Sequence, residues 1–389
     1  MLSVFFRSLR LHLLWWIRSI VPTLHPAAPL SMRRWLLILI AMPLFTALQL
    51  VHWIGFLIDE LCFRDYRKIK IEAPLFITGI PRSGTTFLHR TLAMDTSAYC
   101  SVVTWEAILA PSITERKVIA ALIRADKYLG SPFRKVLNRL LEARTDDFNA
   151  IHEIGLNAPE EDYLWLLPAG GCFILSMAFP FSAWLRATAT PQKMTDRQRR
   201  QFLDFYISCI RRHLYYHGSD RRFLSKNAAF AGWIGPLAER FPDARFLVCI
   251  RQPQNALSSQ LRSLQPARRL FATDPEGTHT KELMTTVFRE NYGYLSTLTE
   301  AMPPEQLACL NQSDMRTASG PLIKLALHRL SLPIGKKLDQ KLKSLGQESG
   351  IYQNKAADSL LNKEEIEVCL LPSYKTIMQS RHRIELPNS

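Results

Sequence analysis

A glycine-rich segment between a predicted strand and a predicted helix constrains the fold of this chain most strongly. Residues 74–78 (PLFIT) form a short apolar run, the segment 79–86 (GIPRSGTT) follows, and residues 87–94 have a helical pattern. Such a turn presents backbone N–H groups and a helix N-terminus to an anion. The spacing is that of the phosphate-binding loop GxxxxGK[ST], with Thr85 in place of the lysine. The sequence therefore predicts an α/β fold in which helices flank a P-loop-like parallel sheet.

A second unit downstream lacks the residues of a Mg-NTP site. Residues 233–241 have a helical pattern, residues 245–250 (RFLVCI) predict a buried strand that ends at Arg251, and a helical pattern resumes over 255–264. In nucleoside-triphosphate-binding P-loop proteins, an aspartate near this point helps to hold magnesium. Because this aspartate and the loop lysine are both missing, we expect a phosphorylated nucleotide to bind here without Mg-NTP chemistry.

Both segments resemble the sulfotransferases that use 3′-phosphoadenylyl sulfate (PAPS). The segment 77–88 (ITGIPRSGTTFL) is similar to their 5′-phosphosulfate-binding loop, and its PRSGTT form is closest to the tyrosylprotein sulfotransferases and their bacterial relatives. Lys226 and the segment 241–251 (FPDARFLVCIR) resemble the family's lysine segment and 3′-phosphate strand, although Gln252 replaces the usual aspartate after the arginine. The resemblance is strong over residues 74–265. It implies a metal-free enzyme of EC 2.8.2 type that moves the sulfo group of PAPS to a hydroxyl acceptor.

The same resemblance implies a role for each matching residue. Arg82 and the loop residues after it would hold the 5′-phosphosulfate, and Arg251 and Ser259 would hold the 3′-phosphate. Lys226 would stabilise the charge that develops on the bridging oxygen, with Arg82 also acting on the transferring group. The expected donor-binding residues are Arg82, Ser83, Gly84, Thr85, Thr86, Arg251 and Ser259.

The acceptor hydroxyl must lose its proton as it attacks, and a positioned base contributes about 10²–10⁴-fold to such a step. Glu106, in the segment VTWEAILAP, falls where the tyrosylprotein relatives carry their catalytic glutamate, if a three-residue insertion is allowed. We take it as the first candidate for the base. The rival candidates lie in the segment NAPEEDY, which resembles an acceptor-side segment of the bacterial relatives, and just upstream of it: Glu160, Glu161, Asp162 and His152.

The first 73 residues have the features of a membrane-associating region. Residues 35–58 contain no charged side chain over 24 positions, and about 20 are needed to span a bilayer. Residues 2–20 predict a basic amphipathic helix suited to an anionic leaflet. We therefore divide the chain into a membrane-associating region, 1–73, and a sulfotransferase catalytic domain, 74–389. Whether 35–58 spans the membrane, lies on it, or belongs to a hydrophobic hairpin packed on the domain stays open.

Charge and cysteine content restrict the partners and the compartment. The net charge of +15 suits a polyanionic ligand, a nucleic acid or an anionic membrane. The basic residues are dispersed and no recognition motif is present, so we do not expect a nucleic-acid partner. The seven cysteines lie far apart without zinc-ligand spacing, so we expect neither a disulfide scaffold nor a metal site. They favour a reducing compartment, namely the cytoplasmic side of a bacterial inner membrane, with an organelle lumen as the alternative.

The acceptor class and two competing functions remain open at this level. A membrane-associated enzyme would suit a hydroxyl-bearing lipid, a glycan or another small molecule as acceptor. The alternatives are a kinase-like phosphotransferase with an altered phosphate loop and a non-catalytic membrane protein that binds a nucleotide. A late segment, 349–355, is a further candidate to cover the nucleotide, with Lys355 at its end.

Overall fold

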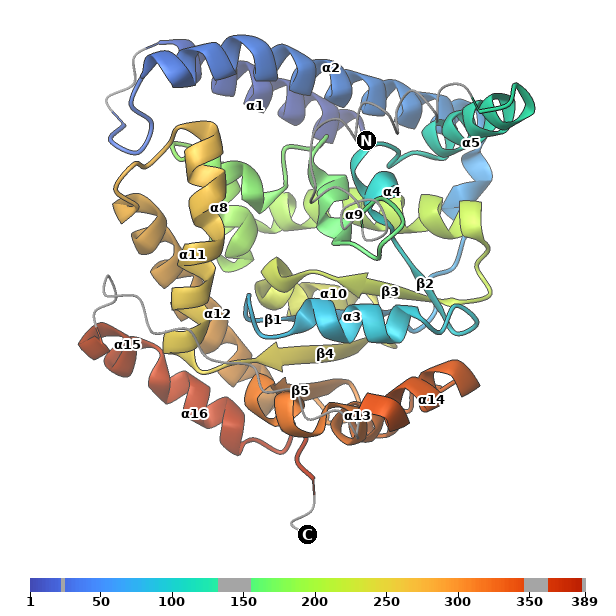
Figure 1. Cartoon of the computed structure of the whole chain (residues 1–389), viewed down its shortest axis with the longest axis vertical. Coiled ribbons are helices and arrows are strands. Elements are labelled where there is room, and N and C mark those ends of the chain that lie inside the picture. Colours follow the sequence, from blue (N-terminus) through green and yellow to red (C-terminus); the bar gives the residue numbers. More distant parts are fainter. Residues whose placement is uncertain (22–24, 132–154, 346–362, 387–389) are drawn as a thin grey trace.

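A parallel β-sheet forms the centre of the protein (Figure 1). The computed structural model describes residues 1–21, 25–131, 155–345 and 363–386. Within them the sheet has five strands in the order β2-β3-β1-β4-β5, and every neighbouring pair is parallel. The strands are β1 (Leu75–Gly79), β2 (Tyr99–Ser101), β3 (Arg222–Lys226), β4 (Arg245–Ile250) and β5 (Leu307–Asn311).

Helices cover both faces of the sheet and add a separate layer at one side of the molecule (Figure 1). Most of them connect one parallel strand to the next, as a parallel sheet requires. The described helices are α1 (Leu2–Ile20), α2 (Met32–Cys62), α3 (Thr85–Ala93), α4 (Thr104–Ile108), α5 (Ile113–Tyr128), α8 (Ala183–Ala189), α9 (Asp196–His217), α10 (Ile234–Arg240), α11 (Pro253–Phe271), α12 (Thr278–Ala301), α13 (Gln312–Arg329), α14 (Lys336–Leu345), α15 (Lys363–Cys369) and α16 (Leu371–Gln379).

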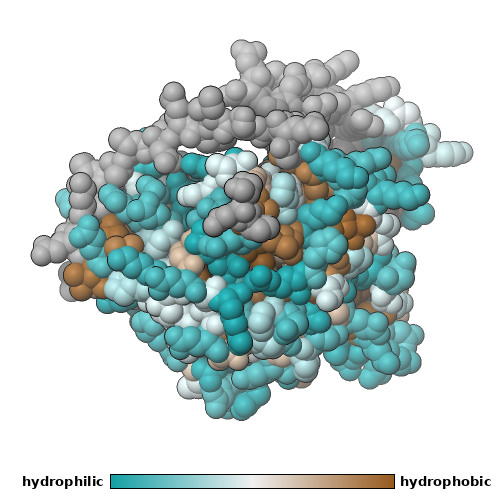
Figure 2. Space-filling model, turned by 90° about the horizontal axis from the view of Figure 1, so that it is seen from below, coloured by the Kyte–Doolittle hydropathy of each residue, from teal (hydrophilic) through white to brown (hydrophobic). Residues whose placement is uncertain are grey.

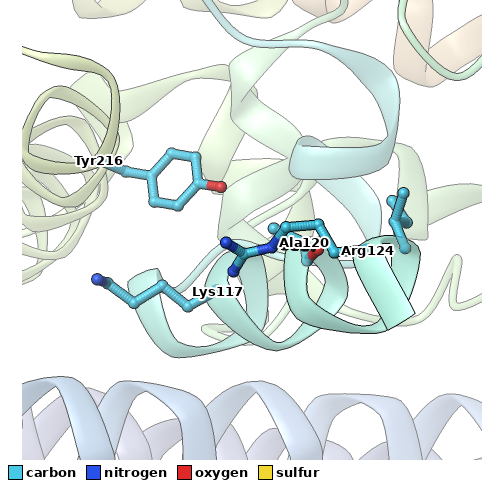
Figure 3. Close-up of a pocket in the computed structure, with 5 residues that line it drawn as sticks. Lys117, Ala120, Arg124 and Tyr216 are labelled. Carbon is cyan, nitrogen blue, oxygen red and sulfur yellow. Dashed lines mark hydrogen bonds between the residues drawn. The ribbon is translucent and has the colours of Figure 1, made fainter. Parts of the chain in front are cut away.

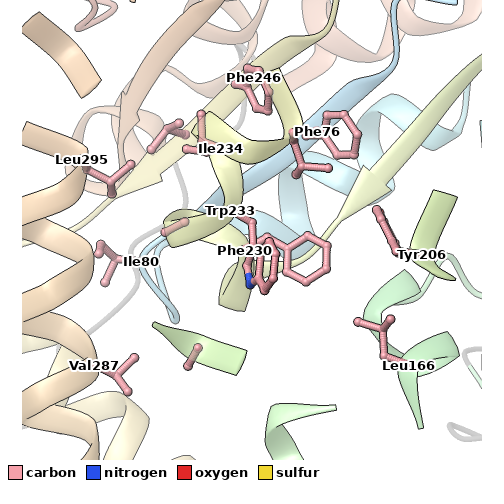
Figure 4. Packing of buried hydrophobic residues seen from close by; sticks show 14 of the residues in the cluster. Phe76, Ile80, Leu166, Tyr206, Phe230, Trp233, Ile234, Phe246, Val287 and Leu295 are labelled. Carbon is pink, nitrogen blue, oxygen red and sulfur yellow. The ribbon is translucent and has the colours of Figure 1, made fainter. Parts of the chain in front are cut away.

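Alternate side chains of β1 enter two different hydrophobic cores. Leu75 and Ile77 join the cluster formed with α3, α13 and α14, whereas Phe76 joins the larger cluster on the other face. In Figure 4, Phe76, Phe246 and Ile234 belong to that larger cluster, which continues to Trp233 from the segment before α10. Because successive side chains of a strand point to opposite faces, both faces of this strand are buried and its sequence is continuously apolar.

The structure confirms the strand–loop–helix units expected from the sequence. The strand expected over 74–78 is β1, displaced by one residue, and the helix expected over 87–94 is α3, which begins two residues earlier. The strand over 245–250 has the expected bounds as β4. The helices expected over 233–241 and 255–264 are α10 and the longer α11. The expected α/β architecture, a parallel sheet flanked by helices, is therefore present.

The N-terminal region forms two helices that pack on the rest of the protein. α1 occupies the range expected for the amphipathic helix, and α2 contains the whole apolar run. α2 is long and apolar enough to cross a membrane, and no other helix of the described residues meets that description. Val4 of α1 and Phe56 of α2 belong to the larger hydrophobic cluster. The division at residue 73 stays a prediction, but the two regions share one core.

Gly79 lies where β1 approaches β4 too closely for any side chain. Its φ is +131°, and a Cβ atom there would lie 2.1 Å from the carbonyl oxygen of Cys249. We expect Gly79→Ala to lower the free energy of unfolding by about 3–5 kcal/mol, because strain and a backbone clash add together. The measurement is urea denaturation followed by circular dichroism.

Gly293 provides a matched control for this substitution. It lies within α12, and a Cβ atom there meets nothing within 4 Å. Gly293→Ala should be neutral or should stabilise the protein by about 0.5–1 kcal/mol, because alanine is the better helix former. Equal stability of the Gly79→Ala variant and the wild type would contradict the close approach of β1 and β4.

Candidate active site

The predicted site residues gather at the carboxyl edge of the sheet. β1 leads into the glycine-rich loop, β3 ends at Lys226, and β4 ends immediately before Arg251. Backbone hydrogen bonds fix this arrangement, since the N–H of Ile80 donates to the carbonyl of Cys249 at 3.0 Å and the N–H of Asn227 donates to that of Ile77 at 2.9 Å. Ligands of open parallel sheets bind at this edge, where neighbouring connections diverge.

The loop between β1 and α3 has the backbone of an anion-binding turn. Arg82 has a φ of +67° and Gly84 a φ of +94°, so two positions adopt the left-handed conformation. Gly84 is the N-cap of α3, and it has no side chain that could accept a hydrogen bond from the helix end. The first N–H groups of the helix are therefore available to a ligand. The hydroxyl of Ser83 is buried and has no hydrogen-bond partner in the structure. Thr85 is buried and Thr86 is exposed.

Hydrogen bonds join the loop to β4, α11 and α13. The Nε atom of Arg82 donates to the hydroxyl of Ser259 at 3.2 Å. The guanidinium of Arg251 donates to the carbonyl of Arg82 at 2.9 Å, and the amide of Gln312 donates to the same carbonyl at 3.3 Å. The hydroxyl of Tyr292 donates to the carbonyl of Arg251. The expected 5′-side and 3′-side ligands are thus in direct contact.

Positive charge accumulates around Arg251. Burial lowers the pKa of Arg251 below its ordinary value, and the charges of Arg316 and Arg82 lower it further, with a smaller effect from Arg262. These residues come from the loop after β1, the end of β4, α11 and α13. Like charges held together in this way are unfavourable unless an anion compensates them. The cluster therefore favours a ligand with several negative charges.

Lys226 lies next to the loop and is paired with the acidic segment. Its Cα position is in register with Ile77 of β1, two residues before the loop. Its ammonium group lies 2.5 Å from the carboxylate of Glu161 and 4.0 Å from that of Glu160. Burial raises the pKa of Glu161 above its ordinary value, and Lys226 opposes that shift in part. A carboxylate with a raised pKa is a stronger base, and this one lies beside the lysine expected at the bridging oxygen.

Glu106 occupies a different environment, among basic side chains. Its carboxylate lies 2.5 Å from the Nε2 atom of His217, 3.7 Å from the Nδ1 atom of His213 and 4.0 Å from the Nε atom of Arg116. The side chain is buried. Burial alone would raise the pKa of Glu106, but the hydrogen bond from His217 and the charges of Arg116 and His213 outweigh it and lower the pKa to about 2. Glu106 is thus an ionised carboxylate within a buried charged cluster.

This cluster of Glu106, His213 and His217 was not predicted from the sequence. Ligand atoms of Glu106, His213 and His217 lie within 4.8 Å of one another, an arrangement that could hold a metal ion. The guanidinium of Arg116 beside the carboxylate opposes a bound cation, and His217 already bonds the carboxylate directly. We therefore describe the group as a hydrogen-bonded charge cluster. The two histidines are four residues apart on α9, a spacing that could have drawn attention to them.

A surface hollow of about 510 Å³ lies between α5 and α9, and no loop residue lines it (Figure 3). In Figure 3, Lys117 and Arg124 of α5 lie on one side of it and Tyr216 of α9 on the other. Tyr216 adjoins His217, and its ring lies 5.9 Å from the guanidinium of Arg116. The hollow therefore borders the Glu106 cluster and not the arginine cluster.

The structure describes one of the three remaining candidates, and it adds two residues that were not predicted. Asp162 is buried and accepts a hydrogen bond from the hydroxyl of Tyr206, and burial raises its pKa to about 7. His152 and Lys355 lie outside the described residues. Gln312 and Tyr292 contact the loop and Arg251 but were not predicted. Gln312 directly follows β5, which ends at Asn311 at the same edge of the sheet. Prediction of β5 would have been needed to identify Gln312, and β5 was not predicted from the sequence.

Comparison with known proteins agrees with this architecture. Sulfotransferase STF9 from Mycobacterium avium aligns with a TM-score of 0.65 at 14% identity, over 97% of this chain and 94% of that one. Sulfotransferase STF1 from Mycobacterium tuberculosis H37Rv aligns with a TM-score of 0.56 at 14% identity, over 95% of this chain and 92% of that one. These similarities establish a common fold. No curated protein matches the sequence significantly.

A family-wide comparison of sequences covers most of the chain. The profile described as "Sulfotransferase family" matches residues 74–333, which include the loop, Lys226, Arg251 and Ser259. The matched region is more than half of the chain and contains the whole described sheet. The chain therefore belongs to the sulfotransferase family.

Proposed function

We propose that the protein transfers the sulfo group of PAPS to a hydroxyl acceptor. The observation that carries this proposal is the contact between the loop and the 3′-phosphate candidates, in which Arg82 bonds Ser259 and Arg251 bonds the loop backbone. One ligand with phosphate groups at both ends of a nucleoside would meet both sets of residues. Membership of the sulfotransferase family supports PAPS as that ligand.

The residues present fit a donor with several negative charges. Ser83 offers a buried hydroxyl without a partner, and the left-handed turn at Arg82 and Gly84 leaves backbone N–H groups at the N-terminus of α3. Arginine can grip two anionic oxygens at once, and Arg82 and Arg251 lie at the two ends of the site. Bound PAPS would supply the activated sulfo group. The chain would supply alignment and positive charge, which dominate catalysis of the related phosphoryl transfers.

The proposed reaction joins the acceptor oxygen to sulfur as the bond from sulfur to the bridging phosphate oxygen breaks. Adenosine 3′,5′-bisphosphate leaves, and its new negative charge is stabilised by Lys226 and Arg82. The acceptor proton passes to a carboxylate of the enzyme. Glu161 suits this role because it lies 2.5 Å from Lys226 and burial raises its pKa. Glu106, bonded by His217 and with a pKa of about 2, stays a sequence-based candidate for the same role.

The acceptor and the compartment are further parts of the proposal. We place a hydroxyl-bearing lipid, a glycan or another small molecule at the side of Lys226 that faces Glu160 and Glu161. All seven cysteines lie in the described residues and none forms a disulfide, which supports a reducing compartment and hence the cytoplasmic side of a membrane. The closer relation to tyrosylprotein sulfotransferases stays a prediction from the PRSGTT sequence.

Calorimetric titration with adenosine 3′,5′-bisphosphate tests the donor site directly. The full chain should bind the bisphosphate without magnesium and more tightly than AMP, because AMP lacks the 3′-phosphate. Arg251→Met should weaken bisphosphate binding by about 10–100-fold, the loss expected when a charge-assisted hydrogen bond is removed. Arg269→Met serves as the matched control, because Arg269 is an exposed arginine in the last turn of α11.

Two other binding results would favour the competing functions. A folded sample that binds Mg-ATP and not the bisphosphate would exclude the sulfotransferase proposal and favour the kinase-like alternative. Tight bisphosphate binding without turnover on any of a broad panel of hydroxyl acceptors would favour a non-catalytic nucleotide-binding protein.

Kinetics of glutamate variants with labelled PAPS and amphipathic alcohols test the base. Glu161→Gln should lower kcat by about 10²–10⁴-fold and leave bisphosphate affinity unchanged. It should also remove the rise of kcat with pH that the deprotonation of Glu161 produces. Glu239→Gln, a change at an exposed glutamate of α10, should leave kcat unaltered. An intact pH profile in the Glu161→Gln variant would transfer the role to Glu160 or Glu106.

Acid unfolding tests the charge state of Glu106. Its pKa in the folded protein, about 2, is below the ordinary value of 4.5. The stability that it contributes is therefore fully present above about pH 4.5 and is lost as the pH falls toward 2, with a total of roughly 3 kcal/mol. Glu106→Gln should lower stability at neutral pH and flatten the pH dependence in this window. The measurement is urea denaturation at a series of pH values, and an unchanged slope in the variant would contradict the assignment.

A further inference from the structure

We propose that α1, α2 and α5 form a membrane-facing surface that lies in the plane of one leaflet, and that α2 does not cross the bilayer. The inference concerns how the protein sits on a membrane and does not depend on the identity of the donor. It rests on three observations: the polar contacts on the inner side of α2, the apolar residues on its outer side, and the sign of the surrounding charge.

Asp59 ties the end of α2 to the catalytic domain. Its carboxylate accepts hydrogen bonds from the backbone N–H groups of Ile113 and Thr114, each at 2.9 Å, and from the hydroxyl of Thr114 at 2.7 Å. It also pairs with the Nε atom of Arg212 at 2.9 Å, and both side chains are fully buried. Glu60 adds a second contact to Arg212 at 2.8 Å. Removal of either partner would leave an uncompensated buried charge.

The middle and the start of α2 are tied in the same way. The Nδ1 atom of His52 lies 2.5 Å from the carboxylate of Glu115, and the indole of Trp53 donates to the carbonyl of Pro168 at 3.0 Å. The guanidinium of Arg34 donates to the carbonyls of Phe271 and Ala178 at 3.0 and 3.1 Å. A spanning helix would have to break these contacts, and it would carry the imidazole of His52 into hydrocarbon, where ionisable side chains are disfavoured.

The outer side of α2 is apolar along its length. Its exposed positions recur at intervals of three and four residues, so they form one stripe. Monomeric soluble proteins rarely expose a continuous apolar surface of this extent. The large apolar side chains of the stripe are Trp35, Leu36, Leu39, Ile40, Leu44, Leu50, Val51, Ile54, Leu57 and Leu61.

α1 extends the stripe because most of its leucine and isoleucine side chains are exposed. Its buried residues are Val4, Ser8, His12, Trp15 and Ser19, three of which are polar. α5 adds a third group at one end of the layer (Figure 1). The exposed apolar residues of the two helices are Leu2, Phe6, Leu9, Leu13, Leu14, Ile17, Ile20, Val118, Leu122, Ile123 and Tyr128. The opposite face of the molecule, shown in Figure 2, is mostly hydrophilic where residues are described.

The charges around this surface favour an anionic leaflet over a second copy of the chain. No acidic side chain occurs from Leu2 to Ile58. Exposed cations accompany the apolar residues, and a two-fold dimer through this surface would place them against one another. Anionic headgroups would instead neutralise them while the apolar side chains enter the acyl region. The exposed basic residues of the three helices outside the hollow are Arg10, Arg18, Arg33 and Lys127.

Flotation with lipid vesicles tests the surface. The full chain, freed of detergent in the presence of vesicles, should float with phosphatidylcholine vesicles that contain phosphatidylglycerol and less well with phosphatidylcholine alone. The double variant Ile40→Asp, Ile54→Asp should partition about a hundredfold more weakly, because two apolar contacts become charged. Val368→Asp is the matched control, since Val368 is an exposed apolar residue of α15 at the other end of the molecule (Figure 1). A discrete dimer that does not float would overturn the proposal.

Labelling of single cysteines in sealed membrane vesicles decides between lying and spanning. Met32 and Cys62 are exposed at the two ends of α2, and Lys336 is exposed on α14 of the catalytic domain. In a background of Cys369→Ser, native Cys62 provides one reporter, and Met32→Cys or Lys336→Cys, each combined with Cys62→Ser, provides the others. A membrane-impermeant maleimide should reach all three from the same side. Labelling of Met32→Cys and Cys62 from opposite sides would overturn the proposal.

Bisphosphate titration separates this proposal from the proposed function. The double variant should keep the wild-type affinity for adenosine 3′,5′-bisphosphate in detergent, since neither substitution touches the donor site. Loss of that affinity in the double variant alone would show that the layer supports the fold of the site and would overturn the view that its outer side only contacts lipid. Absence of bisphosphate binding in the wild type would reject the donor assignment and leave the vesicle experiments decisive for the membrane surface.

Discussion

The position of β1 between β3 and β4 is the constraint on which the site depends. Hydrogen bonds from Ile80 to Cys249 and from Asn227 to Ile77 set the three strand ends level with one another. Each strand then delivers one element of the site at the same edge, namely the loop, Lys226 and Arg251. The chain thereby assembles residues that are more than 160 positions apart in sequence through main-chain register, with both cores of the sheet holding that register in place.

Charge is compensated in different ways at the phosphate-binding loop and at the buried carboxylates of Glu106 and Asp59. At the loop, burial and neighbouring arginines lower the pKa of Arg251, so the site gathers positive charge that an anionic ligand would compensate. At Glu106 and at Asp59, buried carboxylates are already neutralised by basic side chains of α9 or α5. The positive charge at the loop is suited to binding, because a ligand would supply the compensating negative charge. The buried carboxylates are suited to holding helices together, because side chains of the protein itself supply the compensating positive charge.

The sequence predicted those features that depend on local pattern and missed those that depend on tertiary partners. The strands β1 and β4, the helix α1 and the loop between β1 and α3 follow from apolar runs, turn residues and helical periodicity. The side of α1 that packs inward could not be predicted in this way, because helical periodicity defines the faces of a helix but not which face is covered by the rest of the protein. The partners of Glu106 lie 107 and 111 residues away on α9, and the pairing of Glu161 with Lys226 joins two distant segments. Such contacts are fixed only when the sheet brings the segments together.

α11 connects the donor-site end of the domain to the N-terminal helices in a single helix. It begins at Pro253, directly after Arg251 and Gln252, and its last residue, Phe271, accepts a hydrogen bond from Arg34 at the start of α2. Its 19 residues, which include Pro266, make a helix about 28 Å long. On the proposed membrane arrangement, the length of this helix separates the donor site from the lipid. An acceptor that remains in the membrane would then need a headgroup long enough to reach the donor site. The length of α11 would therefore set the minimum length of such an acceptor.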